Sequence, residues 1–380
     1  MIKKKIMLVF GTRPEAIKMA PLYHALKAAD GQFVTLLCVT AQHRQMLDQV
    51  LRTFEITPDL DLNVMTPGQD LFDVTAGVLL GMRRVLIDHK PDVVLVHGDT
   101  TTSLATAMAG FYASVPVGHV EAGLRTHDVY APFPEEFNRQ VTSRVTRWHF
   151  APTPLSRQNL LDEHVPEANI VVTGNTVIDS LFWTLKRIEA DASRRASIEA
   201  FLSAQLPFNW RNSRYVLITG HRRENFGDGF IQICSALRDL AQRYKDVRFV
   251  YPVHLNPNVQ QPVNAILHGI TNVHLVHPLE YEPFVYLLKH SYIVLTDSGG
   301  IQEEAPGLGK PVLVMRDVTE RPEAVDAGTV RLVGASRDRI FTNVVELLED
   351  EKSYQAMSRA NNPYGDGRAC GRIVDTLRNN

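Results

Sequence analysis

Four acidic residues in the first half of the sequence have the types and settings expected of proton-transfer groups. Asp99 lies in HGDTTT, Glu121 in VEAG, and Glu135 with Glu136 in APFPEE. Carboxyl groups gathered at one site repel each other and lose solvent, which raises at least one pKa into the range useful for acid and base catalysis. Singly, Asp99 could be only a helix N-cap, and Glu136 only a solvated or salt-bridged side chain. Together the four residues predict a proton-transfer site.

The segment FGTRPEAIK, which follows the first apolar run, could bind an anion. Thr12 and Glu15 have the spacing of a capping box, and Pro14 suits a first helical turn, so a helix should begin here. Arg13 and Lys18 would then lie near the positively polarised helix N-terminus. The alternative is a capped surface helix with solvated charges.

A second anion-binding segment is DSGGIQEE, residues 297–304, after the apolar run YIVLT. Gly299 and Gly300 carry no side chains, so backbone N–H groups at a helix start could approach a pyrophosphate, and Ser298 adds a hydroxyl donor. Glu304 could accept hydrogen bonds from ribose hydroxyls. A purely structural tight turn is the alternative.

Positive charge also follows the predicted strand RYVLITG. His221, Arg222 and Arg223 lie in GHRREN, residues 220–225. These groups could neutralise the negative charges of a diphosphate. Ordinary surface arginines are the alternative.

No sequence pattern predicts a metal ion or another bound cofactor. GxGxxG is absent after the first apolar run, and GxxxxGK[ST] is absent throughout. Histidines at predicted strand positions lack metal-ligand spacing and should mostly be core or hydrogen-bonded residues: His97, His119, His254 and His277. The cysteines form no CxxC pair and should be reduced thiols: Cys38, Cys234 and Cys370.

These segments need a scaffold that brings strand ends together. Short apolar runs bounded by Gly, Pro or Asp alternate with helical segments, which is typical of βαβ units. The first half contains the predicted strands KIMLVF, VTLLCV, DVVLVHGD, PVGHVEAG and NIVVTGN, and the second half RYVLITG, RFVYPVH, NVHLVHP, YIVLTDSGG and PVLVMRD. A polar stretch at 183–213 separates the halves, with the join near 173–182. The sequence therefore predicts two doubly wound α/β domains whose strand-end loops face a cleft.

Length and composition agree with this architecture. The chain has 380 residues, more than one ordinary core accommodates, with 44% hydrophobic and 22% charged residues. Its net charge of -2 provides no basic field for nucleic acid or an anionic membrane. No apolar run reaches the roughly 18 residues needed to cross a bilayer, and the run at 6–10 is too short for a signal peptide. We expect a cytoplasmic protein with no nucleic-acid and no membrane partner.

The four motifs, in this order and spacing, closely resemble the non-hydrolysing UDP-N-acetylglucosamine (UDP-GlcNAc) 2-epimerase family of bacteria. The resemblance covers nearly the whole chain, including AQHRQMLDQV, YPVHLNPNV, RDVTERPEAVDAGT and NPYGDG. It implies the glycosyltransferase-B architecture of two Rossmann-like domains, and usually a homodimer. We place the domains at 1–176, with the catalytic acids, and 177–361, which binds UDP; a C-terminal helix in 362–380 should cross back to the first domain.

The resemblance also implies roles for individual residues. The catalytic group would be Asp99, Glu121, Glu135 and His221. Contacts to UDP and the phosphates would come from Arg13, His221, Ser298, Gly299, Gly300 and Glu304, with Phe284 in YEPFVYLL facing the uracil. Lys18 is added to this set because of its expected place near the helix N-terminus. A neighbouring site for activation by substrate would use Gln42, His43, Gln45 and Arg222. Phe133 departs from the tryptophan that many members have in the PEE loop, which affects loop packing but no acid.

The implied reaction interconverts UDP-GlcNAc and UDP-N-acetylmannosamine (UDP-ManNAc), which would serve surface polysaccharide synthesis. The C2–H bond is not α to a carbonyl, so direct deprotonation would give an unstabilised carbanion. Oxidation at C3 by NAD is one way around this, but the missing dinucleotide motif weakens it. Expulsion of UDP with loss of the C2 proton, through 2-acetamidoglucal, uses the groups this sequence supplies.

Three rival functions are also compatible with the sequence. A glycosyltransferase of the same architecture would need an acceptor site, for which only the basic segment at 3–5 is available. A hydrolysing epimerase would release free ManNAc and UDP. A catalytically inactive nucleotide-sugar sensor would not need the set of acids.

Overall fold

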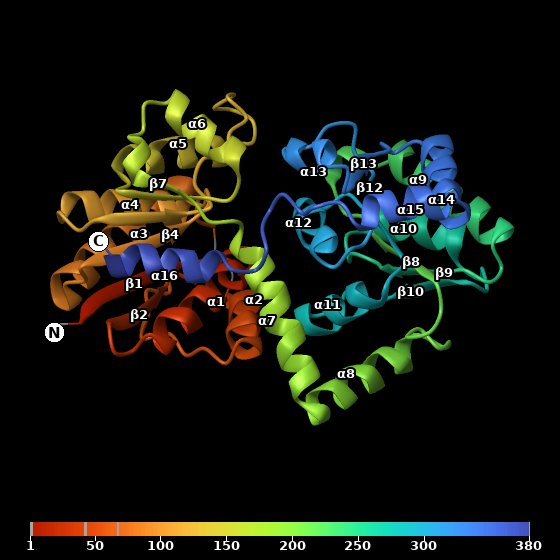
Figure 1. Cartoon of the computed structure of the whole chain (residues 1–380), viewed down its shortest axis with the longest axis horizontal. Helices are drawn as coiled ribbons and strands as arrows, with labels where there is room; N and C mark the ends of the chain where they lie inside the picture. The colour runs from red at the N-terminus through yellow and green to blue at the C-terminus, as the bar shows by residue number, and fades with distance from the viewer. Residues whose placement is uncertain (1–2, 42–43, 67, 380) are drawn as a thin grey trace. The chain divides into compact units, whose positions relative to one another are not determined.

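The computed structural model describes residues 3–41, 44–66 and 68–379 (Figure 1). The chain forms two compact units: Met1–Phe182 together with Tyr364–Asn380, and Trp183–Pro363.

The first unit contains a seven-stranded parallel sheet in the order β3-β2-β1-β4-β5-β6-β7. Its strands are β1 Lys4–Phe10, β2 Phe33–Val39, β3 Leu60–Asp61, β4 Val93–His97, β5 Val117–Val120, β6 Trp148–Ala151 and β7 Ile170–Val172. The strand order reverses between β1 and β4. Ligands of open α/β sheets bind beyond the strand ends at such a reversal, so the loops after β1 and β4 are the natural place for a site.

Helices pack on the sheet of the first unit. They are α1 Arg13–Ala28, α2 Arg44–Thr53, α3 Leu71–His89, α4 Thr101–Tyr112, α5 Glu135–Val145, α6 Pro154–Asp162, the start of α7 Thr176–Ala190, and α16 Ala369–Asn379, with a 3₁₀ turn at Glu167–Asn169. Residues of α3 such as Val78 and Met82 pack against Met7 of β1 and Val94 of β4. Because helices cover both faces of a parallel sheet, its strands are mostly apolar, as β1 is from Ile6 to Phe10.

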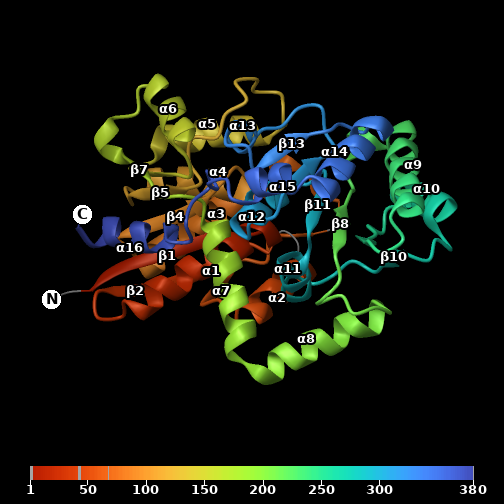
Figure 2. The same cartoon turned by 45° about the vertical axis from the view of Figure 1, so that its right-hand side comes forward.

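The C-terminal helix α16 belongs to the first unit. It packs beside α1 in both views (Figure 1, Figure 2). The Lys4 ammonium donates to the carbonyl of Leu377 at 2.9 Å, and the Asp179 carboxylate accepts from the amides of Ala369 at 3.1 Å and Cys370 at 2.9 Å. The Asp179 bonds satisfy amides at the start of α16, which otherwise lack intrahelical partners.

The second unit contains a six-stranded parallel sheet in the order β10-β9-β8-β11-β12-β13. Its strands are β8 Tyr215–Thr219, β9 Arg248–Pro252, β10 Val273–Val276, β11 Ile293–Thr296, β12 Val312–Val314 and β13 Val330–Leu332. Its helices are the end of α7, α8 Ala192–Gln205, α9 Asp228–Arg243, α10 Pro257–Leu267, α11 Tyr281–His290, α12 Gly299–Gly307, α13 Pro322–Asp326, α14 Arg337–Glu349 and α15 Glu351–Ser358, with a 3₁₀ turn at Arg223–Asn225. Here the order reverses between β8 and β11, so the loops after these two strands are the equivalent position.

The prediction of two doubly wound α/β domains is confirmed, and every strand predicted from the sequence is present. Three short strands were not predicted: β3, β6 and β13. No helix in the described part of the chain is long and apolar enough to cross a membrane.

Candidate active site

The turn after β1 is fixed to the start of α4 by one buried carboxylate. Glu15 accepts hydrogen bonds from the amides of Gly11 at 3.1 Å and Thr12 at 2.8 Å, and from the hydroxyls of Thr100 at 2.6 Å and Ser103 at 3.2 Å. Burial raises the pKa of Glu15, while the hydrogen bonds from Thr100, Thr12 and Gly11 oppose that rise. The expected capping box at Thr12 is confirmed, and it also ties two strand-end loops together.

Arg13 and Lys18 both lie on α1, but in different surroundings. Arg13 occupies the first turn, is half-buried and forms no hydrogen bond or ion pair with a described residue. Its guanidinium is therefore available to an anion. Lys18, one turn further on, forms an ion pair with Glu121.

Glu121 directly follows β5 at a backbone φ of 64°, a left-handed conformation that is strained for a residue with a Cβ. Besides the Lys18 ammonium, its carboxylate accepts a hydrogen bond from the Asn175 side-chain amide at 2.8 Å. The His97 imidazole is 3.9 Å away. Burial lowers the pKa of His97 to about 4, despite the opposing charge of Glu121, so this ring is neutral at neutral pH.

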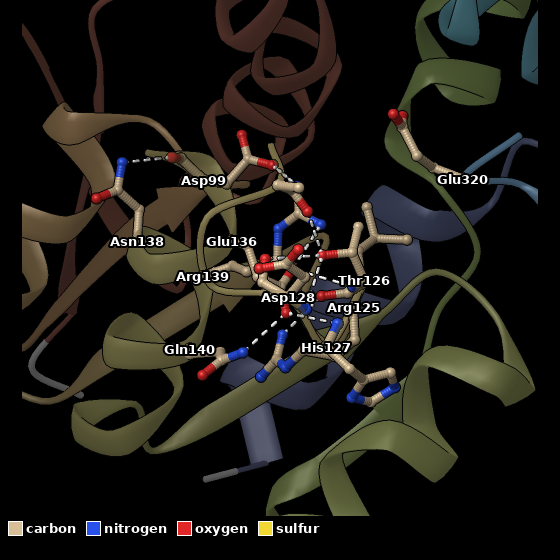
Figure 3. Close-up of polar contacts among 12 residues, drawn as sticks. Asp99, Arg125, Thr126, His127, Asp128, Glu136, Asn138, Arg139, Gln140 and Glu320 are labelled. Atoms are coloured by element: carbon tan, nitrogen blue, oxygen red, sulfur yellow. Dashed lines mark hydrogen bonds and ion pairs between the residues drawn. The ribbon is translucent and has the colours of Figure 1, made fainter. Parts of the chain in front are cut away.

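Asp99, in the loop between β4 and α4, is held by α5. Its carboxylate accepts a hydrogen bond from Arg139 at 2.5 Å, and its carbonyl accepts from the Asn138 side chain at 2.8 Å (Figure 3). Burial raises the pKa of Asp99; Arg139 opposes this and nearby Glu121 adds to it. Thr100, not Asp99, is the N-cap of α4. The simpler reading of Asp99 as a cap is therefore wrong.

The two glutamates of the PEE segment differ. Glu136 is fully buried and accepts from the Arg139 guanidinium at 3.2 Å, the Gln140 amide at 2.8 Å and the backbone amides of Thr126 at 3.1 Å and His127 at 3.2 Å (Figure 3). It therefore anchors the loop before α5 and the guanidinium that holds Asp99. Glu135 is half-buried and forms no hydrogen bond or ion pair with any described residue, so no contact joins it to Asp99 or Glu121.

In the second unit, the loop after β8 is tied to the end of β11. The buried carboxylate of Asp297 accepts from the backbone amides of His221 and Arg222, each at 2.8 Å. The His221 imidazole lies 3.4 Å from the second carboxylate oxygen. The histidine loop and the glycine pair of DSGG are therefore brought together by direct hydrogen bonds.

Helix α12 begins at Gly299, as the sequence predicted, and Ser298 is its N-cap residue. A Cβ at Gly299 would lie 2.7 Å from the Arg321 guanidinium, whereas no described atom lies within 4 Å of a Cβ at Gly300. The space beside the Cα of Gly300, in the first turn of α12, is therefore open. The amide end of a helix attracts anions.

Glu304 and Phe284 are linked through α11. The Glu304 carboxylate accepts a hydrogen bond from the Tyr281 hydroxyl at 3.1 Å. Phe284 is half-buried, one turn beyond Tyr281 on the same helix. The predicted ribose acceptor and the predicted uracil contact thus lie on adjoining helices of one unit.

The residues proposed for activation by substrate are only partly described. Gln42 and His43 lie outside the described residues. Gln45 is exposed in the first turn of α2, and Arg222 follows β8 in the second unit. Their role stays a prediction.

Five residues that contact or adjoin the predicted site residues were not identified from the sequence, namely Asn138, Arg139, Asn175, Asp297 and Arg321. The spacing of Arg139 three residues after Glu136 on a helix was a usable signal for an ion pair. The position of Asp297 at the head of DSGG was another. Asn175 carried no comparable signal.

A family model described as UDP-N-acetylglucosamine 2-epimerase matches residues 24–378. The UDP-N-acetylglucosamine 2-epimerase of Escherichia coli K12 is 60% identical over 376 residues, 99% of each chain. A crystal structure of UDP-GlcNAc 2-epimerase from Neisseria meningitidis bound to UDP-GlcNAc superposes with a TM-score of 0.89 at 51% identity, covering 99% of this chain and all of that one. Acinetobacter baumannii MurG, 13% identical with a TM-score of 0.59, shares the fold alone. With these similarities over nearly its whole length, the chain belongs to the UDP-N-acetylglucosamine 2-epimerase family, with the glycosyltransferase-B type of fold.

Proposed function

We propose that this protein is a non-hydrolysing epimerase that interconverts UDP-GlcNAc and UDP-ManNAc by inverting C2 of the sugar. Membership of the family supports the substrate and the reaction. The observation that carries the chemistry is the pair of carboxyl groups after β4 and β5, Asp99 and Glu121, each tied to a different cation.

The reaction proceeds in two balanced steps. A carboxylate removes the proton at C2, the C2–H electrons form the C1–C2 double bond, and the C1–O electrons leave with UDP. The product is 2-acetamidoglucal. UDP then adds back to C1 while an acid delivers a proton to C2 on the opposite face.

Different surroundings suit the acids to opposite tasks. Asp99 has a raised pKa caused by burial, which favours its protonated form, while the Lys18 ammonium favours the charged form of Glu121. Pairs of carboxyl groups whose surroundings separate their pKa values commonly divide acid and base roles. Glu135, which has no partner among the described residues, is the third group that we assign to proton transfer.

The departing UDP needs positive groups and amide donors. We assign the diphosphate to Arg13, His221 and the start of α12 at Ser298, Gly299 and Gly300. Glu304 would accept from the ribose hydroxyls, and Phe284 would contact the uracil. Stabilising charge that develops on the leaving group is commonly among the largest contributions to catalysis.

Incubation of the purified protein with UDP-GlcNAc in deuterated water tests this proposal. We expect deuterium at C2 of both nucleotide sugars at equilibrium, with no accumulation of free ManNAc. Asp99→Asn and Glu121→Gln should each lower the exchange rate by about 100-fold or more, since positioned proton transfer contributes about that much. Glu167→Gln, a surface residue paired with Arg157, should leave it unchanged. Turnover without deuterium at C2, or an unaffected rate in both variants, would overturn the assignment.

We also propose that the protein is a homodimer that is activated by its own substrate. Exposed apolar side chains on α3 and α4 support the first part, because contiguous apolar surfaces commonly mark interfaces. They include Leu80, Ile87, Phe111 and Tyr112. For the second part we retain the expected residues Gln42, His43, Gln45 and Arg222.

A further inference from the structure

Asp297, directly after β11, is a fully buried carboxylate that uses its two oxygens differently. Oδ2 accepts hydrogen bonds from the amides of His221 and Arg222, each at 2.8 Å, and from the Asn225 side chain at 3.3 Å. Oδ1 has no hydrogen bond among the described residues. It lies 3.4 Å from Nδ1 of His221.

This arrangement favours a His221 ring that is protonated at Nδ1. A buried carboxylate oxygen is costly unless a donor satisfies it. The imidazole offers a donor to Oδ1 only when Nδ1 carries a proton. In the neutral ring Nε2 is then unprotonated, and in the imidazolium both nitrogens donate.

Two other titratable or charged residues lie beside the His221 imidazole, namely His254 and Arg222. His254, from the loop after β9, stacks on it with ring centroids 5.6 Å apart, and Arg222 adjoins it in the chain. Burial lowers the pKa of His221, Asp297 opposes that, and Arg222 and His254 add to the lowering. Asp297 is thus the group here that favours the protonated ring.

The exposed side of the ring can meet a ligand. The His221 side chain is 42% exposed while that of Asp297 is 0% exposed, so the carboxylate acts from behind the imidazole. A buried carboxylate that fixes the tautomer and stabilises the imidazolium is the arrangement found in catalytic triads.

We propose that Asp297 is a positioning residue for the epimerisation: it holds Nδ1 of His221 protonated and favours the imidazolium, whose Nε2–H then donates to the departing diphosphate. The second proton of the imidazolium comes from solvent before UDP leaves, so no further reactant is needed. This inference rests on the function proposed above and adds to it the residue that sets the state of His221.

The decisive variant is Asp297→Asn. Its side-chain oxygen can keep the two backbone hydrogen bonds, so its amide group faces Nδ1 of His221 as a donor. That contact favours the tautomer protonated at Nε2 and removes the charge that stabilises the imidazolium. Removing a single electrostatic contribution of this kind should lower kcat by about 100-fold or more, with little change in KM.

Nitrogen-15 NMR of histidine-labelled protein reads the imidazole directly, with the His221 signals assigned from His221→Asn. In the unmodified protein we expect neutral His221 to be protonated at Nδ1. In Asp297→Asn we expect the other tautomer, and a titration midpoint at lower pH. A merely structural role of Asp297 would not move these signals in a variant that stays folded.

Asp317→Asn is the matched control, because Asp317 is an exposed aspartate of the same unit whose partner is Arg339. It should leave kcat and the His221 signals unchanged. The proposal is overturned if His221 of the unmodified protein is protonated at Nε2, a result that needs no variant to fold. It is equally overturned if folded Asp297→Asn keeps the original tautomer or keeps kcat within a factor of two. Absence of epimerase activity in the unmodified protein, with the NMR result as expected, would instead refute the proposed function.

Discussion

Replacing Arg139 by Gln should destabilise the first unit in a pH-dependent way. The guanidinium lies between two carboxyl groups, donating to Asp99 at 2.5 Å and to Glu136 at 3.2 Å (Figure 3). The Arg139 side chain is 11% exposed, that of Glu136 is buried, and that of Asp99 is 27% exposed. Removing one partner of a buried ion pair costs about 3–5 kcal/mol. The partial exposure of Asp99 places the expected loss near the lower end, about 3 kcal/mol at pH 7.

The sign of the pH dependence follows from Asp99. Its folded pKa is already raised by burial, and Arg139 is the principal opposing group, so the variant raises it further. A carboxyl group whose pKa is higher in the folded protein than in the unfolded chain lowers stability as the pH rises above its pKa in the unfolded chain, because the unfolded chain releases the proton first. The deficit of Arg139→Gln should therefore shrink as the pH falls from 7 toward 4.

Urea unfolding of the variant and the unmodified protein at several pH values measures the deficit. Arg157→Gln is the control, since its partner Glu167 is 74% exposed and such pairs contribute about 0.5 kcal/mol. A loss in Arg139→Gln no larger than in this control, or one that does not depend on pH, would refute the reasoning. The variant should also move to higher pH the limb of the activity profile that Asp99→Asn abolishes.

Three further outcomes are expected. Gly11→Ala should unfold the protein or lower its Tm sharply, because the added Cβ would lie 2.0 Å from a threonine hydroxyl. Gly371→Ala, in open space on α16, should instead raise stability by about 0.5–1 kcal/mol. Thermal melts of the two variants and the unmodified protein test both expectations. Burial lowers the pKa of both His97 and His149 to about 4, so that, as the pH falls, these side chains bind protons in the unfolded chain before they do in the folded protein. The free energy of unfolding should therefore fall between about pH 6.5 and 4, as urea titrations would show. Ile87→Glu on the apolar surface of α3 should convert a dimer to monomers, and an unchanged mass in light scattering would count against that interface.

The elements that the sequence predicted well are those whose signal is local. KIMLVF is apolar at successive positions because helices cover both faces of β1, and the apolar run ends at Gly11 just before the helix cap. The three missed strands are short, and β6 contains the polar His149. Its strand conformation depends on pairing opposite His119 of β5, which no local pattern reveals.

The residues of the candidate site likewise divide into those that a local sequence pattern predicts and those that it does not. Asp99 and Glu121 were predictable because both follow apolar strands, and parallel strands end at one edge of a sheet. Their partners were not: Arg139 is 40 residues from Asp99, and Asn175 is 54 residues from Glu121. Such pairs arise from the folding of α5 and α7 onto the sheet, and residue types at these separations carry no pattern.

The central claim is that UDP leaves C1 and returns during each inversion. UDP-GlcNAc carrying oxygen-18 in the bridge between C1 and the β-phosphorus tests it most directly, followed by phosphorus-31 NMR of the recovered nucleotide sugars. We expect the label to move into nonbridging positions of the β-phosphate as turnover proceeds. Inversion at C2 with the label still entirely in the bridge would contradict the account.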